Sequence, residues 1–252
     1  MKAENRKRNV SLENVRNEWK IKGRKRRWNK IAGENMNRDK LKWLFFDMGS
    51  TLIDESVAIE HRIREVIEGT DITYEEFLEK KVFFAKQNKP ADLATLEYFG
   101  LKKTPWHKED ERLYPEAAEC LECLHKHYKI GIIANQSLGS EERLERFGIR
   151  KYIDIVVASA EEGVAKPDKR IFEIALNWAD CKRSEAAMIG DRLDNDIVPA
   201  NALGMYTIWI KQGNWIYAEP KELLEYPDWK IRSLKELEEL VEDCPENHCR
   251  YY

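Results

Sequence analysis

The chain has 252 residues, of which 42% are hydrophobic and 35% are charged. The apolar residues suffice for a sizeable core, and the mixed signs of the charges argue against wholesale disorder. No apolar run approaches the ~18 residues of a membrane span, and the N-terminus lacks the apolar region of a secretory signal. Five cysteines do not make a disulfide framework over this length, so we expect a cytoplasmic protein without membrane contacts.

Residues 1–38 are strongly basic, whereas the rest of the chain is acidic. They contain 13 Lys and Arg against 4 Glu, and the remainder contains 30 basic and 42 acidic residues. The run Arg24–Arg27 is of a kind that contacts nucleic acid, but charge runs are more often solvated tails. Met36 is also a candidate natural start. We therefore expect a disordered arm at 1–38, and contacts with nucleic acid only through it.

The first expected element after the arm is a short buried strand at 41–46. It ends at the sequence DMGST, residues 47–51, which is typical of a turn. Residues 56–100 have apolar side chains at spacings of three and four and are predicted to be helical. Residues 101–113 are charged and irregular, and we expect no regular element there.

From residue 115 onward, helices and strands are expected to alternate. The predicted helices are 115–128, 140–147, 168–179, 194–203 and 233–241. The predicted strands are 129–134, 153–158, 186–190 and 206–210. Strands that alternate with helices indicate an α/β fold, with a parallel sheet that helices cover on both faces. In such sheets, ligands bind beyond the carboxyl ends of the strands.

Polar side chains follow each of the first four expected strands. Asp47 comes after the first, Asn135 after the second and Asp191 after the fourth, and Lys166 lies in the loop after the third. We expect these groups to meet at one edge of the sheet. Asp47, Asp191 and Asp196 would supply the oxygen ligands that a hard cation such as Mg²⁺ prefers.

The turn after Asp47 adds a place for an anion. Backbone amides of Gly49, Ser50 and Thr51 could surround a phosphate, and Lys166 would balance its charge. A carboxylate nucleophile, a divalent cation, a fixed ammonium and backbone donors are the components of phosphoryl transfer through an aspartyl-phosphate. From spacing alone, the same residues could instead serve only to cap helices and turns.

Four segments of the chain resemble the motifs of the haloacid dehalogenase (HAD) superfamily of hydrolases. They are FFDMGSTL at 45–52, IIAN at 132–135, KPD at 166–168 and GDRLDND at 190–196. The resemblance spans residues 41–210. It implies a Rossmann-like parallel sheet of strand order 3-2-1-4-5 and a helical cap inserted after the first motif. The implied domains are a core at 39–54 and 114–252 and a cap at 55–113.

The resemblance also implies roles for the matched residues. Asp47 would be the nucleophile, and Lys166 would hold both the nucleophile and the phosphoryl group. Asn135 would contact the phosphoryl group, and the turn at Gly49 and Ser50 would bind it as well.

The implied metal is Mg²⁺. Its ligands would be Asp47, the backbone carbonyl of Gly49 and Asp191, with Asp196 supporting the site. The expected protein is a Mg²⁺-dependent phosphatase of a small phosphorylated metabolite, as a monomer or a homodimer.

Two positions depart from the pattern of family phosphatases. Gly49 stands where they usually have a second Asp, whose proton transfer typically contributes ~10²–10⁴-fold in rate. Ala134 stands where a Ser or Thr hydroxyl contacts phosphate, a hydrogen bond worth about 1.5–3 kcal/mol. We therefore expect slow hydrolysis of alkyl phosphates, unless His107 or Glu109 supplies the proton. Gly49 could also have a positive φ that disfavours Asp.

Three alternative functions stay open. The protein could bind a phosphorylated metabolite or a protein partner without turnover. It could be a haloacid dehalogenase, which also lacks the second Asp but needs no metal. It could be a phosphonate-cleaving relative with a Schiff-base lysine, although lysines spaced along a helix are usually a solvated face. The lysines concerned are Lys80, Lys81, Lys86 and Lys89.

Two groups of cysteines could bind a metal, although we expect neither to do so. One is Cys120 and Cys123 on a predicted helix, where ordinary packing is the more common explanation. The other is Cys244, His248 and Cys249, whose spacing is not that of a standard zinc finger.

The composition of residues 1–38 yields a first testable prediction, because it offers no apolar face to bury. A truncated chain that starts at Met36 is expected to retain the melting temperature and the catalytic rate of the full chain. Thermal unfolding and turnover of the two proteins, measured side by side, check this. A large loss in either quantity would mean that the arm packs on the core.

Overall fold

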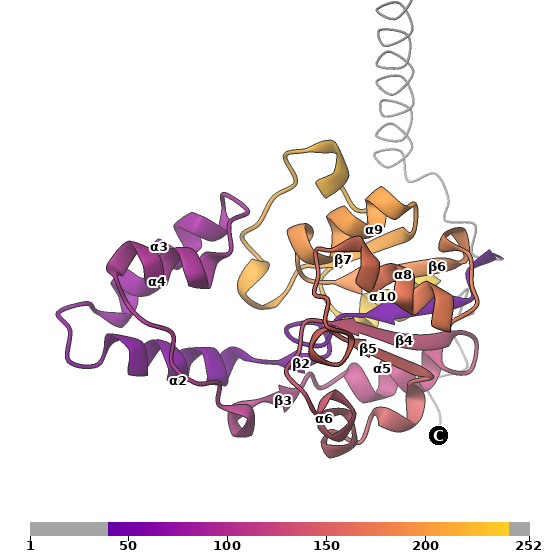
Figure 1. Cartoon of the computed structure of the whole chain (residues 1–252), viewed down its shortest axis with the longest axis horizontal. Coiled ribbons are helices and arrows are strands. Elements are labelled where there is room, and N and C mark those ends of the chain that lie inside the picture. Colours follow the sequence, from indigo (N-terminus) through magenta and orange to yellow (C-terminus); the bar gives the residue numbers. More distant parts are fainter. Residues whose placement is uncertain (1–39, 242–252) are drawn as a thin grey trace, which may run out of the picture.

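The computed structural model describes residues 40–241 (Figure 1). The basic arm expected at 1–38 lies outside the described residues, as do Met36 and the group of Cys244, His248 and Cys249.

A parallel six-stranded sheet forms the centre of the protein, in the order β5-β4-β1-β6-β7-β8. The strands are β1 Trp43–Phe46, β4 Lys129–Ala134, β5 Ile155–Ala158, β6 Ala186–Gly190, β7 Tyr206–Ile210 and β8 Trp229–Ile231. The first five of these in chain order confirm the expected order 3-2-1-4-5. The sixth strand, β8, was not expected, because three residues are too few for an alternating pattern.

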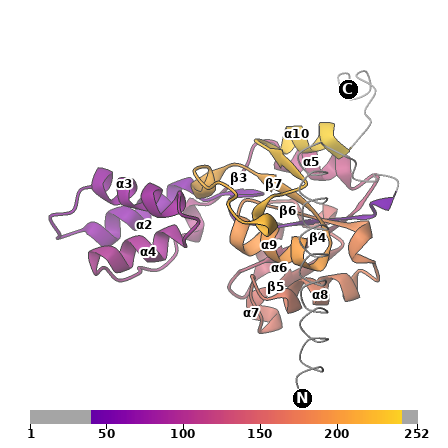
Figure 2. The same cartoon turned by 90° about the horizontal axis from the view of Figure 1, so that it is seen from above.

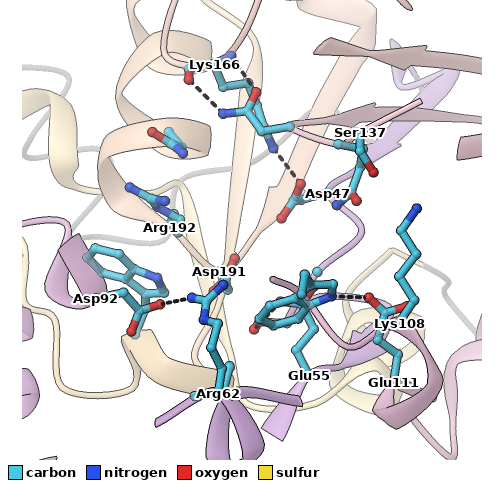
Figure 3. A pocket seen from close by; sticks show the side chains of 18 of the residues that line it. Asp47, Glu55, Arg62, Asp92, Lys108, Glu111, Ser137, Lys166, Asp191 and Arg192 are labelled. Atoms are coloured by element: carbon cyan, nitrogen blue, oxygen red, sulfur yellow. Dashed lines mark hydrogen bonds and ion pairs between the residues drawn. The ribbon is translucent and has the colours of Figure 1, made fainter. Parts of the chain in front are cut away.

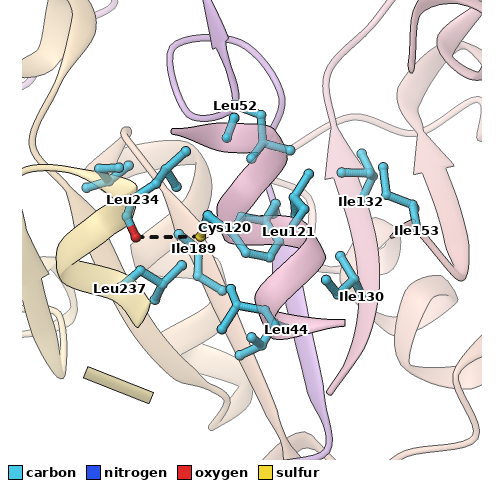
Figure 4. Close-up of a cluster of buried hydrophobic side chains, with 14 of the residues drawn as sticks. Leu44, Leu52, Cys120, Leu121, Ile130, Ile132, Ile153, Ile189, Leu234 and Leu237 are labelled. Carbon is cyan, nitrogen blue, oxygen red and sulfur yellow. Dashed lines mark hydrogen bonds between the residues drawn. The ribbon is translucent and has the colours of Figure 1, made fainter. Parts of the chain in front are cut away.

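Helices cover both faces of this sheet (Figures 1 and 2). On one face lie α5 Ala117–Leu124, α6 Ser140–Arg146 and α10 Leu234–Val241, and on the other lie α8 Lys169–Trp178 and α9 Val198–Leu203. A short helix, α7 Ser159–Glu162, follows β5. Side chains along β1 point alternately to the two faces of the sheet. Leu44 and Phe46 pack in one apolar cluster, and Phe45 packs in the other. Figure 4 shows the first cluster, in which α5 meets the sheet.

Three helices lie to one side of the sheet (Figure 2): α2 Ser56–Ile67, α3 Tyr74–Ala85 and α4 Ala91–Phe99. They have an apolar cluster of their own around Ile63, Phe77 and Leu96. We call residues 55–113 the helical insert. A two-stranded antiparallel ribbon, β2 Ile53–Asp54 and β3 Arg112–Leu113, joins its two ends to the core. The ribbon corrects the expectation that 101–113 has no regular element.

The helical insert touches the core a second time, away from the ribbon. The Asn88 side-chain amide donates to the Glu219 carbonyl at 2.9 Å and to the Glu225 carboxylate at 3.2 Å. The Lys221 ammonium donates to the Lys86 carbonyl at 2.8 Å. The loop that follows β7 therefore holds the insert in addition to the ribbon.

Lys81 contradicts the expectation of a solvated lysine face in the insert. Its side chain is 5% exposed, and its ammonium lies 2.7 Å from the Asp92 carboxylate on α4. Attraction to Lys81 holds the pKa of Asp92 below its usual range, although burial works in the opposite direction. This ion pair joins α3 to α4.

A π-helical turn stands where the pattern predicted the start of an α-helix at 194. This turn, η5 Leu193–Ile197, precedes α9 and contains Asp196. The remaining short turns are η2 Lys108–Asp110, η3 Arg150–Tyr152, η4 Arg183–Glu185, η6 Gly213–Trp215 and η7 Leu223–Glu225. No helix in the described part of the chain is long and apolar enough to span a membrane.

Cys120 packs within the core. It is fully buried, and its thiol donates to the Leu234 carbonyl at 3.5 Å (Figure 4). Within residues 40–241, the clusters able to hold a metal do not include Cys120 or Cys123.

Packing of α5 on the sheet yields a prediction for stability. Leu121 is fully buried, so Leu121→Ala is expected to lower the free energy of unfolding by about 2–5 kcal/mol. Leu138→Ala is the control, because Leu138 is 68% exposed and should change stability little. Urea unfolding of both variants measures the difference, and equal values would contradict the assignment of Leu121 to the core.

Candidate active site

A buried lysine lies between two carboxylates at the carboxyl ends of the strands. Asp47 directly follows β1, and its amide donates to the Ile189 carbonyl of β6. The Lys166 ammonium lies 2.6 Å from Asp47 Oδ1 and 2.6 Å from Asp196 Oδ1. All three side chains are buried. The expected convergence of Asp47 and Lys166 is thus present (Figure 3).

Asp191 brings a third carboxylate to the same place. One oxygen of each of Asp47, Asp191 and Asp196 lies within 4.8 Å of the others. Burial, together with the charges of Asp47 and Asp196, raises the pKa of Asp191 well above its ordinary value. Burial would lower the pKa of Lys166, but attraction to Asp196 and Asp47 outweighs it and leaves that pKa raised.

This charge balance fits a divalent cation. Three buried carboxylates face one ammonium, and such groups are costly unless a proton or a cation neutralises them. The donors are all oxygens, as a hard ion prefers. Asp47, Asp191 and Asp196 could hold Mg²⁺, and the predicted contribution of the Gly49 carbonyl stays a prediction.

Close packing explains why the chain has glycine at 190. A Cβ at this position would lie 2.4 Å from the Asp196 carboxyl carbon, so only glycine leaves room for that carboxylate. The Arg192 amide donates to Asp196 Oδ2 at 3.0 Å, and the Trp209 indole donates to the Asp191 carbonyl at 2.7 Å. Neighbouring groups therefore fix the loop that carries both carboxylates.

The turn after Asp47 is strained at Ser50 and not at Gly49. Ser50 has a φ of 55°, a left-handed value that is unfavourable for a residue with a Cβ. The Gln212 amide supports the turn by donating to the carbonyls of Ser50 and Thr51 at 3.0 and 2.9 Å. Gly49 itself does not have the positive φ that the sequence analysis considered for it, so that prediction is wrong.

The side chain of Glu55 occupies the space next to Gly49. A Cβ on Gly49 would lie 2.5 Å from Glu55 Oε1 and 2.7 Å from Oε2. Burial raises the pKa of Glu55 to about 7, and Arg143 opposes this shift from 3.3 Å away. The sequence pattern does not indicate Glu55 as a site residue, because nothing in it shows that the turn folds this side chain back against Gly49.

Glu111 organises the wall of the site next to the insert. Its carboxylate is buried and accepts hydrogen bonds from Arg143 at 2.5 and 2.9 Å and from Arg146 at 2.8 Å. The Trp106 indole donates to Glu111 at 2.6 Å, and Arg62 lies over the Trp106 ring. The sequence does not predict these contacts, because they join the end of the insert to residues of α6 that are distant in the chain.

Asn135 acts on the backbone of Lys166. Its amide nitrogen donates to the Lys166 carbonyl at 2.8 Å, and its oxygen accepts from the Lys166 amide at 2.7 Å. The side chain thus positions the segment that carries the ammonium. Contact of Asn135 with a phosphoryl group stays a prediction.

A pocket of about 420 Å³ connects these groups (Figure 3). Both the core and the helical insert line it, and Glu55 and Trp106 belong to its wall together with Asp47 and Asp191. Its basic side chains are Arg62, Lys103, Lys108, Arg143, Lys166 and Arg192.

His107 and Glu109, the proton donors considered from the sequence, are not among the residues that line this pocket. The His107 imidazole lies 2.9 Å from Glu65 and 3.2 Å from Glu109. Hydrogen bonding to Glu65 raises the pKa of His107.

Comparison with known proteins identifies the family of the chain. Residues 41–204 match the model of the haloacid dehalogenase-like hydrolases. The chain belongs to this family. Glyceraldehyde 3-phosphate phosphatase of Methanocaldococcus jannaschii is 30% identical over 226 residues, which cover 81% of this chain and 98% of that protein. Pyrimidine 5'-nucleotidase YjjG of Escherichia coli (strain K12) is 41% identical over 129 residues, but these cover only 50% of this chain and 56% of that protein.

Solved structures share the fold of this HAD-like hydrolase. HAD-hydrolase YfnB from Bacillus subtilis, bound to magnesium, matches with a TM-score of 0.60 and 20% identity, over 80% of this chain and 99% of that chain. A HAD phosphatase from Thermococcus onnurineus matches with a TM-score of 0.56 and 22% identity, over 80% and 98% of the respective chains. At these identities the similarity supports the architecture alone.

The charge balance of the site yields a prediction. Lys166→Met is expected to lower the free energy of unfolding by about 3–5 kcal/mol in the presence of EDTA, because it leaves buried carboxylates without their cation. Lys169→Met is the control, since Lys169 is exposed at the start of α8. Urea unfolding measures both. An equally small change in the two variants would show that the ammonium does not offset the buried charge.

Proposed function

We propose that the protein is a Mg²⁺-dependent phosphatase of small phosphorylated metabolites. The observation that carries the proposal is the Asp47 carboxylate beside the Lys166 ammonium, with Asp191 and Asp196 in the same buried cluster. A nucleophile, a fixed positive charge and oxygen ligands for a cation are the components that phosphoryl transfer requires.

The chain's own residues have distinct roles in this reaction. Asp47 attacks phosphorus and forms an aspartyl-phosphate, which water then hydrolyses. Lys166 holds the Asp47 carboxylate and offsets the charge of the phosphoryl oxygens, and Asn135 holds the backbone of Lys166. Bound Mg²⁺ would supply further electrostatic stabilisation of the charge on the transferred group. The Gly49 amide would bind the phosphoryl oxygens. The expected contribution of the next two amides is wrong, because Ser50 donates to the Ile53 carbonyl at 2.8 Å and Thr51 donates to the Met48 carbonyl at 3.3 Å.

The pocket supports a small anionic substrate. Its volume of about 420 Å³ suits a metabolite, and its basic side chains come from both the insert and the core. Relatives that match much of the chain are named for small phosphate esters, including the glyceraldehyde 3-phosphate phosphatases of Methanocaldococcus jannaschii and Pyrococcus furiosus. Glyceraldehyde 3-phosphate is therefore the first substrate to assay.

The alternatives have less support but remain distinguishable. A haloacid dehalogenase needs no cation, which would leave the buried Asp191 carboxylate without a role, whereas Asp196 would still pair with Lys166. Release of chloride from 2-chloropropionate without Mg²⁺ would favour a dehalogenase. A binding module would bind phosphate esters without hydrolysing any of them.

Hydrolysis of p-nitrophenyl phosphate tests the proposal. The wild type is expected to be active with Mg²⁺ and inactive with EDTA. Asp47→Asn should abolish turnover while the fold remains intact, because an amide cannot act as the nucleophile. Asp71→Asn is the control, since Asp71 is exposed in the insert and should leave the rate unchanged. Retained turnover in Asp47→Asn would remove the nucleophile assignment.

A further inference from the structure

The pocket contains a carboxyl group that the motifs do not assign. Family phosphatases have an acid at the position of Gly49, and here the space next to that glycine is filled by Glu55. The carbon that a side chain at 49 would begin with lies 2.5 Å from Glu55 Oε1, 2.7 Å from Oε2 and 2.8 Å from Cδ. The carboxyl group of Glu55 therefore reaches, from a different place in the chain, the region that an Asp at 49 would enter.

Two neighbours hold this carboxyl group in place. The Ser50 hydroxyl donates to Glu55 Oε2 at 3.4 Å, and Arg143 lies 3.3 Å from Oε1. Arg143 is itself fixed by Glu111, to which it donates at 2.5 and 2.9 Å. Glu55 also lines the pocket with Asp47 and Lys166 (Figure 3).

We infer that Glu55 is the acid and base of this enzyme and replaces the carboxyl group that Gly49 lacks. The inference rests on the proposed phosphatase activity. It assigns proton transfer to a residue of the segment that joins β2 to α2.

Phosphoryl transfer takes place in two steps, and Glu55 moves a proton in each. An oxygen of Asp47 bonds to phosphorus, the bond from phosphorus to the ester oxygen breaks, and the proton of Glu55 passes to that oxygen, so that an alcohol leaves. The Glu55 carboxylate then takes a proton from water as the water oxygen bonds to phosphorus and the bond from phosphorus to Asp47 breaks. Inorganic phosphate is released, and both side chains return to their starting states.

The same geometry shows what an Asp at position 49 would displace. In Gly49→Asp, the new side chain would start within 2.5–2.8 Å of the Glu55 carboxyl atoms, and two carboxylates would compete for one place. Gly49→Asp combined with Glu55→Ala would remove this conflict.

Leaving-group dependence tests the inference, with p-nitrophenyl, phenyl and benzyl phosphate as probes for the full chain in Mg²⁺. These esters are similar in size, but only p-nitrophenolate leaves readily without a proton. Glu55→Gln is expected to lose ~10²–10⁴-fold in kcat/KM on benzyl phosphate and far less on p-nitrophenyl phosphate. Gly49→Asp/Glu55→Ala should recover benzyl phosphate turnover relative to Glu55→Ala. His107→Gln and Glu109→Gln are controls that should keep the wild-type ratio of the two rates.

Other results would overturn the inference. Equal losses on all three esters in Glu55→Gln, at an unchanged melting temperature, would mean that Glu55 acts only by shaping the pocket. A wild type that hydrolyses p-nitrophenyl phosphate but not benzyl phosphate would mean that no acid is present, while the proposed phosphatase activity would stand. Absence of turnover on every ester would overturn the phosphatase proposal as well.

Discussion

The rest of the site depends on the ion pairs of the Lys166 ammonium with Asp47 and Asp196. The ammonium joins the loops after β1, β5 and β6 at a single buried point. Without it, three buried carboxylates would face one another with no lysine to offset their charge. Close packing and hydrogen bonds around the lysine keep these side chains in place. Gly190 leaves room for Asp196, and Asn135 fixes the backbone on both sides of the Lys166 peptide unit.

A second buried charge, Glu111, connects the site to the helical insert. Its carboxylate lies at the end of the insert, whereas Arg143 and Arg146 belong to α6 of the core. Hydrogen bonds between charged partners contribute more than neutral ones, and a buried carboxylate cannot give them up cheaply. The wall of the pocket that carries Trp106 is therefore positioned by the same ion pairs that orient Arg143 toward Glu55.

Much of the core could be predicted from the sequence, because the relevant signals are local. The strand at 129–134 and the strand at 186–190 have the predicted limits, since each is a short apolar run bounded by polar residues. Asp47, Lys166 and Asp191 were predicted from their places after strands, and topology brings them together. Shorter elements were missed, including β8 and the β2–β3 ribbon, because two or three residues carry no periodic pattern.

Contacts between distant segments explain the other differences. Lys81 looks like one of several solvated lysines until α4 places Asp92 beside it. Glu55 looks like a surface acid until the turn at Ser50 folds it against Gly49. In both cases the residue type was visible, but its environment is set by a neighbour that the pattern does not reveal.

The attachments of the helical insert to the core differ in strength. At the ribbon the chain itself crosses between insert and core, so that end can only bend. At Asn88 and Lys86 the attachment consists of side-chain hydrogen bonds to the loop after β7, and a typical hydrogen bond between neutral groups has a net value of only about 0.5–1.5 kcal/mol. Separating the insert from the loop after β7 would break these polar contacts. At the other end, the buried Glu111 carboxylate would in addition lose its partners Arg143 and Arg146, so that end is held more strongly.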